Sequence, residues 1–175
     1  MSSSERPTDI STWRLVPDRC IVTIRAHATR HAVQSTIHGL DGTLGGALDS
    51  LEETARGTIQ VPVHQQDFGS RLRNVAMRRH LDITQWPEAR FQLNRMTVHS
   101  ESPWTVDVQG TIFYRGHTHR LTAHATGTLS DTELHTHATF RLPLRAVGVR
   151  PPKLLWLRVT ETVDVEVQIV AKGTS

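Results

Sequence analysis

The chain has very little cysteine and no long apolar run. Because Cys20 is its single cysteine in 175 residues, no disulfide can form within it, which excludes a disulfide-stapled scaffold. No stretch approaches the roughly 20 apolar residues that a membrane-spanning helix needs. The first residues, MSSSERPTDIST, lack the apolar core of a secretory signal. If residue 1 is the native start, we therefore expect a cytoplasmic protein.

Positive charge is present but does not indicate a nucleic-acid partner. The net charge is +3 and the isoelectric point is about 9.7. Arginine supplies almost all of it, since lysine occurs only at Lys153 and Lys172. Seventeen acidic residues are interspersed with the basic ones, so no basic stripe of the kind that nucleic-acid binders carry is evident. We expect no nucleic-acid partner.

Alternating apolar and polar residues dominate the chain after a polar start. Residues 1–12 show no periodicity and predict a disordered tail, followed by a single domain over residues 13–172. Strict alternation over Val106–Tyr114, Leu121–Leu129, Leu134–Leu142 and Val163–Ile169 predicts strands with one buried face. Up to eight such strands joined mostly by turns favour an all-β antiparallel meander.

Small residues on the predicted inward face favour a hollow barrel. A sheet of this length must pack on a second sheet or close on itself, and a barrel of roughly eight strands just holds side chains or one ligand. Bulky residues from a helix or from facing strands would fill the same space. The small inward residues are Ala26, Ala28, Ala123, Ala125, Gly127 and Ala138.

One short helix is predicted at about residues 70–81, within an otherwise strand-rich chain. Its apolar residues, Leu72, Val75, Ala76 and Leu81, are spaced roughly three and four apart, and four arginines lie among them. Pro87 then precedes a strand that begins near Glu88. We expect the apolar residues to plug or line one end of the barrel, with the arginines facing water or a polar head group.

Several ordered motifs resemble one known family. They are RNVAMRRHLDITQWPEARF at residues 73–91, Gly110–His119, Phe140–Val149, Arg158–Ala171 and the step Ile37-His38-Gly39. Together they resemble the YceI-like proteins over about residues 13–171. The resemblance implies an extended, lipocalin-like eight-stranded antiparallel barrel with a short helix at one end. It also implies a long apolar tunnel that binds a polyisoprenoid or a quinone tail, with no catalytic residues.

The leading hypothesis is therefore a non-enzymatic carrier of a lipid-like small molecule, which requires no cofactor. Its head-group candidates are Arg78, Arg79 and His80. The predicted cavity-lining residues are Val22, Ile24, Ala26, Ile37, Leu72, Val75, Ala76, Leu81, Phe91, Leu93, Val108, Ile112, Tyr114, Ala123, Ala138, Phe140 and Leu142.

Two alternative functions remain open at this point. An enzyme on the same barrel would use His80 or Tyr114 as acid or base, and would need a buried histidine backed by a carboxylate. A metal- or haem-binding stress protein would use His124, His135 and His137, because residues two apart on a strand share a face. Exposed histidines on a wet barrel face are the simpler interpretation, and no metal is predicted.

The apolar run at residues 150–158 predicts a contact surface. It contains Pro151, Pro152 and Trp156 and is rimmed by Arg150 and Arg158. Two prolines in succession disfavour a regular strand position. We expect this run to serve as a peripheral membrane contact or as a homodimer surface; the alternative is that it folds inward as part of the cavity wall.

Overall fold

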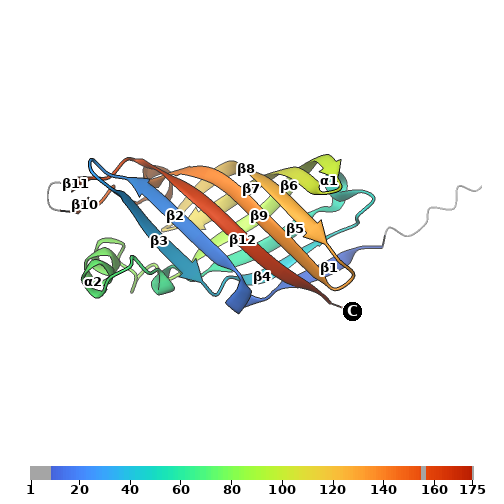
Figure 1. Ribbon diagram of the computed structural model, residues 1–175, viewed down its shortest axis with the longest axis horizontal. Helices are drawn as coiled ribbons and strands as arrows, with labels where there is room; N and C mark the ends of the chain where they lie inside the picture. Colours follow the sequence, from blue (N-terminus) through green and yellow to red (C-terminus); the bar gives the residue numbers. More distant parts are fainter. Residues whose placement is uncertain (1–8, 155–156, 175) are drawn as a thin grey trace, which may run out of the picture.

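The protein forms one closed antiparallel barrel that is elongated along its axis (Figure 1). The computed structural model describes residues 9–154 and 157–174. The main sheet runs in the order β1-β4-β5-β6-β7-β8-β9-β12 and returns to β1 through the pairing of β1 with β12. The strands of this ring are β1 Ser11–Leu15, β4 Asp41–Gly46, β5 Arg56–Val61, β6 Ala89–Glu101, β7 Trp104–Tyr114, β8 His117–Leu129, β9 Glu133–Pro143 and β12 Thr162–Thr174.

Two further strands, β2 (Ile21–His27) and β3 (Ala32–His38), extend the ring rather than adding to it. The 3-10 helix η1 (Pro17–Arg19) separates β1 from β2, and both strands pair with successive parts of β12. Gly39, with a φ of +84°, bends the chain between β3 and β4. β1 and β2 thus act as one bent strand, and β3 and β4 act as another. The barrel is therefore eight-stranded, as predicted.

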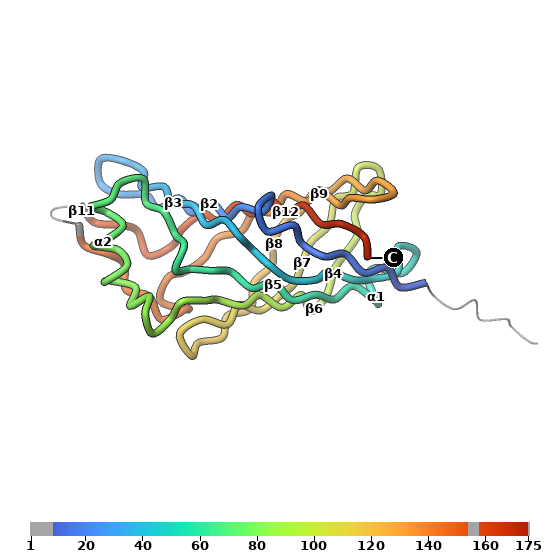
Figure 2. The backbone as a smooth tube through the Cα atoms, turned by 90° about the horizontal axis from the view of Figure 1, so that it is seen from below, coloured from blue at the N-terminus to red at the C-terminus, as the bar shows by residue number. Residues whose placement is uncertain are grey.

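One side of the barrel is completed by non-strand structure. β3 pairs with β2, but on its other edge the described residues offer only a bridge from Thr36 to Asp67. The connection from β5 to β6 fills this gap with the 3-10 helix η2 (Val63–Gln65) and the helix α2 (Arg71–His80). Figure 2 shows α2 at the end of the barrel opposite the C-terminus and the short helix α1 (Leu51–Thr54).

Helix α2 confirms the predicted helix, and local signals explain its bounds. Ser70 caps its first turn, since its hydroxyl accepts a hydrogen bond of 3.2 Å from the backbone N–H of Arg73. It ends at His80, and Asp82 then takes a left-handed conformation with a φ of 49°. Met77 is its one buried residue, and this side chain packs with Leu81, Phe68 and Val147 at the end of the barrel.

Two predicted boundaries need adjustment. β1 begins at Ser11, so the prediction of a disordered tail is wrong for Ser11 and Thr12, which pair with β4 and β12. β12 continues to Thr174, two residues past the predicted end of the domain. Residues 1–8 lie outside the described part of the chain.

The remaining elements lie near α2. The 3-10 helix η3 (Leu144–Val147) follows β9, and a two-stranded hairpin of β10 (Lys153–Leu154) and β11 (Leu157–Arg158) follows η3. Trp156, on which the predicted contact surface partly depends, lies outside the described residues. No helix in the described ranges is both long and apolar enough to cross a membrane.

Candidate ligand-binding cavity

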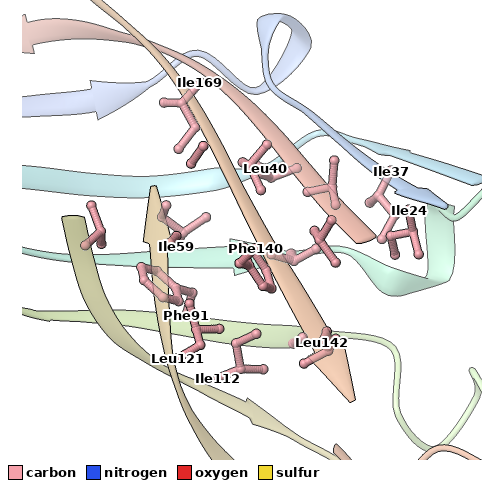
Figure 3. Close-up of a pocket in the computed structure, with 18 of the residues that line it drawn as sticks. Ile24, Ile37, Leu40, Ile59, Phe91, Ile112, Leu121, Phe140, Leu142 and Ile169 are labelled. Carbon is pink, nitrogen blue, oxygen red and sulfur yellow. The ribbon is translucent and has the colours of Figure 1, made fainter. Parts of the chain in front are cut away.

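An apolar cavity of about 380 Å³ extends through the barrel (Figure 3). Strand β7 contributes wall residues from Trp104, its first residue, to Tyr114, its last. At about 3.3 Å per residue and a strand tilt of roughly 40°, these ten steps correspond to about 25 Å along the barrel axis. The cavity therefore has the shape of a channel that suits a chain-like molecule.

The alternation of the strands builds this wall. Every second residue of β8 faces inward, from Leu121 through Ala123, Ala125 and Gly127 to Leu129. Across the ladder, Ala125 lies opposite Ala138 of β9. Two facing methyl groups leave space that larger side chains would fill, so the small inward residues of the sequence account for the hollow interior. Ile24, Phe91, Phe140 and Ile169 supply the bulkier parts of the wall.

Most of the residues predicted to line the cavity face it, and three residues of the helix do not. The strand residues all face the cavity, as does Leu81 just after α2; their role in binding stays a prediction. They are Val22, Ile24, Ala26, Ile37, Leu81, Phe91, Leu93, Val108, Ile112, Tyr114, Ala123, Ala138, Phe140 and Leu142.

The prediction was wrong for Leu72, Val75 and Ala76, which are exposed on the outer side of α2. Leu72 and Leu81 are nine residues apart, which is two and a half turns of a helix, so they lie on opposite faces. The inner face instead carries Arg73 and Met77, which line the cavity. The spacing of the apolar residues alone predicts a single apolar stripe along the helix. The helix instead has one apolar patch on its outer face and another on its inner face.

The three head-group candidates also lie outside the cavity wall. Arg78 and Arg79 are exposed on α2. The His80 ring is exposed too, and its Nε2 lies 2.7 Å from the backbone oxygen of Arg150. Arg73 is the arginine of α2 that reaches the cavity.

A buried polar pair interrupts the apolar wall. Gln66 Nε2 donates a hydrogen bond of 2.8 Å to Ser35 Oγ, and both residues line the cavity. Ser35 is 3% exposed and Gln66 6%. The only charged residues in the described wall are Arg73 and Arg90, and Arg90 stacks its guanidinium over Phe113, 4.4 Å from the ring centre.

The described wall contains no histidine, aspartate or glutamate, so the acid–base pair that an enzyme would need is not found there. Tyr114 lines the cavity, and its hydroxyl donates to the backbone oxygen of Trp86 at 3.1 Å. Burial raises the pKa of the Tyr114 phenol above its ordinary value. The phenol is therefore held in its protonated form, with its hydroxyl fixed on the Trp86 backbone.

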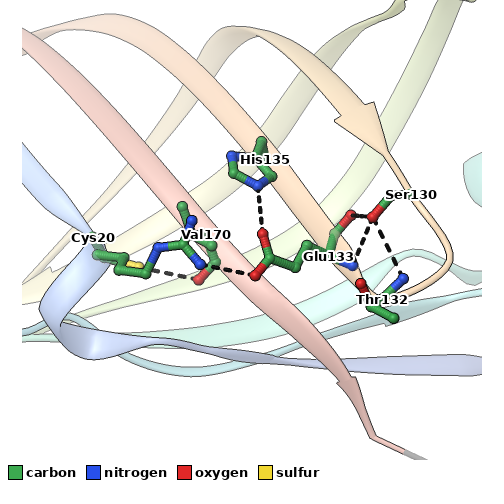
Figure 4. Close-up of polar contacts among 7 residues, drawn as sticks. Cys20, Ser130, Thr132, Glu133, His135 and Val170 are labelled. Carbon is green, nitrogen blue, oxygen red and sulfur yellow. Dashed lines mark hydrogen bonds and ion pairs between the residues drawn. The ribbon is translucent and has the colours of Figure 1, made fainter.

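The histidines that the alternative metal-binding function would use are held apart on the outer surface. His124 and His99 both bond the carboxylate of Asp107. His135 contacts Glu133 (Figure 4), with its Nε2 2.8 Å from the carboxylate, while His137 lies 2.9 Å from Glu166. Within the described residues no group of three or more suitable side chains could hold a metal ion.

These contacts lower the pKa values of the three carboxylates. The pKa of Asp107 is lowered, first by its hydrogen bonds to His99 and His124. The pKa values of Glu133 and Glu166 are lowered in the same way, chiefly by His135 and His137. The outer face of the barrel thus carries separate imidazole–carboxylate pairs rather than a ligand set.

Cys20 is fully buried, with its thiol 3.5 Å from the backbone oxygen of Val170 (Figure 4). Burial raises the pKa of the Cys20 thiol above its ordinary value. The thiol therefore stays protonated at neutral pH, and Cys20 packs as a small buried apolar residue.

Several wall residues were not among those predicted from the sequence. Trp13 and Trp104 line the cavity. Trp13 lies within β1 and Trp104 begins β7, and the alternation of these strands identifies their inward positions. Ser35 has the same signal, because it lies on the same face of β3 as Val33 and Ile37, two residues away on either side. Gln66 leaves η2 in an irregular segment, and no local pattern identifies its inward position.

Comparisons with known proteins agree with this geometry. A family model described as the YceI-like domain matches residues 13–171. No curated protein matches the sequence. A solved polyisoprenoid binding domain from Saccharophagus degradans, implicated in plant cell wall breakdown, is 14% identical with a TM-score of 0.74, over 93% of this chain and 98% of that one.

Two further solved structures share the fold. BcnA of Burkholderia cenocepacia is 13% identical with a TM-score of 0.76, over 89% of this chain and 98% of that one. The YCEI protein of Campylobacter jejuni is 8% identical with a TM-score of 0.69, over 85% of this chain and 90% of that one. At such low identities the likeness establishes the barrel architecture.

Proposed function

Because the chain belongs to the YceI-like family, we propose that it binds and carries a long apolar molecule, such as a polyisoprenoid or the tail of a quinone. The observation that carries this proposal is the channel-like cavity, whose wall is apolar from Trp104 to Tyr114 of β7. The Saccharophagus degradans domain of the same fold is described as polyisoprenoid binding, which supports the same class of ligand here.

The energetics of such a ligand suit this wall. Moving apolar surface out of water contributes roughly 25 cal/mol per Å², so an isoprenoid chain that buries a few hundred Å² gains several kcal/mol before the entropic cost of binding. The volume of about 380 Å³ lies within the range of roughly 300–1,000 Å³ that ligand sites occupy. Neither a metal nor a charged partner is needed for this affinity.

The polar pair supports an orientation for the ligand. Ser35 and Gln66 lie in the part of the wall next to α2, since the neighbouring residues Thr36 and Asp67 form the bridge that closes this side. The hydroxyl hydrogen of Ser35 and the amide oxygen of Gln66 remain available as donor and acceptor. We infer that an uncharged oxygen-bearing head group, such as a quinone carbonyl, lies at this end and the tail extends toward Trp13 and Trp104.

The direct test is to identify what the purified protein contains. Organic extraction followed by mass spectrometry is expected to recover a co-purified isoprenoid or related amphiphile. The extracted and refolded protein is then titrated with a polyprenyl quinone while tryptophan fluorescence is recorded. Saturable quenching is expected, and it should be weaker in the Trp86→Phe variant, because Trp86 packs at the α2 end of the barrel where the head group is inferred to lie. Repeated recovery of empty protein, together with no response to added quinone, contradicts the proposal.

A further inference from the structure

The outer face of α2 combines exposed apolar and cationic side chains. Leu72 is 82% exposed and Val75 is 54% exposed. At 3.6 residues per turn, these two side chains share one face of the helix with Arg71, Arg78 and Arg79. Such an arrangement is costly in water, because large apolar side chains gain nothing from exposure. It is typical of helices that lie at a membrane interface.

The positive charge of this face is balanced only in part by the described residues. Among them, the carboxyl of Asp67 alone has a pKa that is lowered first by a hydrogen bond from Gly69 and, more weakly, by an arginine of the helix, Arg78. The helix carries four arginines and no acidic residue. None of these arginines takes part in the ion pairs found among residues 9–154 and 157–174. The carboxylate of Asp67, just before the helix, accepts hydrogen bonds from Gly69 and from the Asn74 side chain. The face therefore complements an anionic surface.

The opposite face of the same helix belongs to the cavity. Arg73 and Met77 of α2, with Leu81 just after it, line the wall of the channel. Figure 1 shows α2 at one end of the barrel, away from α1. A surface bound to the outer face of α2 would thus lie next to this end of the cavity.

We propose that α2 docks this end of the barrel onto an anionic lipid membrane, with Leu72 and Val75 inserted among the lipid head groups and the arginines on their phosphates. The use of this docking to load or unload cargo rests on the proposed binding function, whereas the docking itself does not. A membrane suits this face because two exposed apolar side chains among flexible arginines match a fluid charged interface.

Vesicle binding tests the proposal. Co-sedimentation is measured with vesicles of phosphatidylcholine alone and of phosphatidylcholine mixed with phosphatidylglycerol. We expect binding to the mixed vesicles, and we expect it to weaken as salt is added. Each arginine near an anionic surface strengthens binding about fivefold. The Arg71→Gln/Arg78→Gln/Arg79→Gln variant should therefore bind roughly a hundredfold more weakly, and Leu72→Gln/Val75→Gln about tenfold more weakly.

Matched controls remove similar groups elsewhere. The Arg14→Gln/Arg56→Gln/Arg95→Gln variant loses the same charge from exposed positions of the barrel strands. Ile10→Gln removes an apolar side chain that is 55% exposed next to β1. Both controls should bind like the parent protein. Circular dichroism checks that every variant is folded.

The outcomes separate docking from cargo binding. A variant whose cavity is blocked by Ala125→Phe should still bind anionic vesicles, because its outer surface is unchanged. Equal binding to neutral and anionic vesicles overturns the proposal. So does vesicle binding that the α2 variants leave unchanged, or binding that the charge control weakens as much as the α2 variant does.

Discussion

Gln66 donates a hydrogen bond to Ser35 inside the wall of an apolar cavity, and both side chains are more than nine-tenths buried. The two residues come from a strand and from the irregular segment that closes the gap beside it. A satisfied buried pair at this position both fastens the segment to the barrel and presents a polar spot to the cavity.

Gln66→Leu tests both roles of this pair. It leaves the Ser35 hydroxyl buried without its partner, so we expect a loss of about 1–3 kcal/mol in the free energy of unfolding. The double variant Ser35→Ala/Gln66→Leu should recover part of that loss, as measured by urea denaturation. Both variants should bind a polyprenyl quinone more weakly but bind a hydrocarbon of similar length as well as the parent does. Equal losses for both ligands would argue against a head-group contact.

Filling the channel should prevent ligand binding without harming the fold. Ala125 faces the cavity and lies opposite Ala138, so the ring introduced by Ala125→Phe occupies ligand space rather than packed core. We expect an unfolding midpoint close to that of the parent and a quinone affinity lower by roughly tenfold or more, a difference of about 1.4 kcal/mol. Thr122→Phe is the matched control, since Thr122 is exposed on the same strand; it should bind normally.

The imidazole–carboxylate pairs predict a loss of stability in acid. The folded-state pKa values of Asp107, Glu133 and Glu166 are lowered, so each carboxylate contributes stability above its ordinary unfolded pKa. That contribution is lost as the pH falls through the lowered folded value. Asp107→Asn should therefore lower the thermal midpoint at neutral pH, and its difference from the parent should shrink below about pH 4. A difference that stays constant in acid would contradict this origin.

Cys20 should be chemically silent in the folded protein. Its burial and raised pKa keep the thiol protonated and out of reach of reagents. We expect no reaction with a thiol-specific chromogenic reagent at neutral pH until denaturant unfolds the barrel, when one equivalent should react. Rapid labelling of the native protein would show that the strand pairing around η1 opens readily.

The sequence predicts the barrel well because its strands carry their own signal. Alternation along β7, β8, β9 and β12 identifies which residues face inward, and the small residues among them indicate the cavity. The bent strands β1–β2 and β3–β4 were harder to predict, because the interruptions at η1 and Gly39 obscure which segments act as one strand.

The parts that the sequence could not predict depend on contacts between distant residues. Gln66 and Ser35 are 31 residues apart, and nothing local to either residue identifies the other. In α2 the spacing of the apolar residues predicts a helix but not which side of it faces the cavity, since Leu72 and Met77 lie on different sides. The packing of Met77 with Phe68 and Val147 decides it, and Leu72 is left exposed.

A chain-length series tests the central claim most directly. Linear isoprenoid alcohols of increasing length are titrated into the delipidated protein, and the dissociation constant of each is measured by tryptophan fluorescence. Each added unit buries further methylene-sized groups at about 0.8 kcal/mol apiece, so affinity should rise steeply with length and level off once the channel from Tyr114 to Trp104 is filled. An affinity that does not depend on chain length, or no binding at any length, would contradict a cavity that carries a long apolar chain.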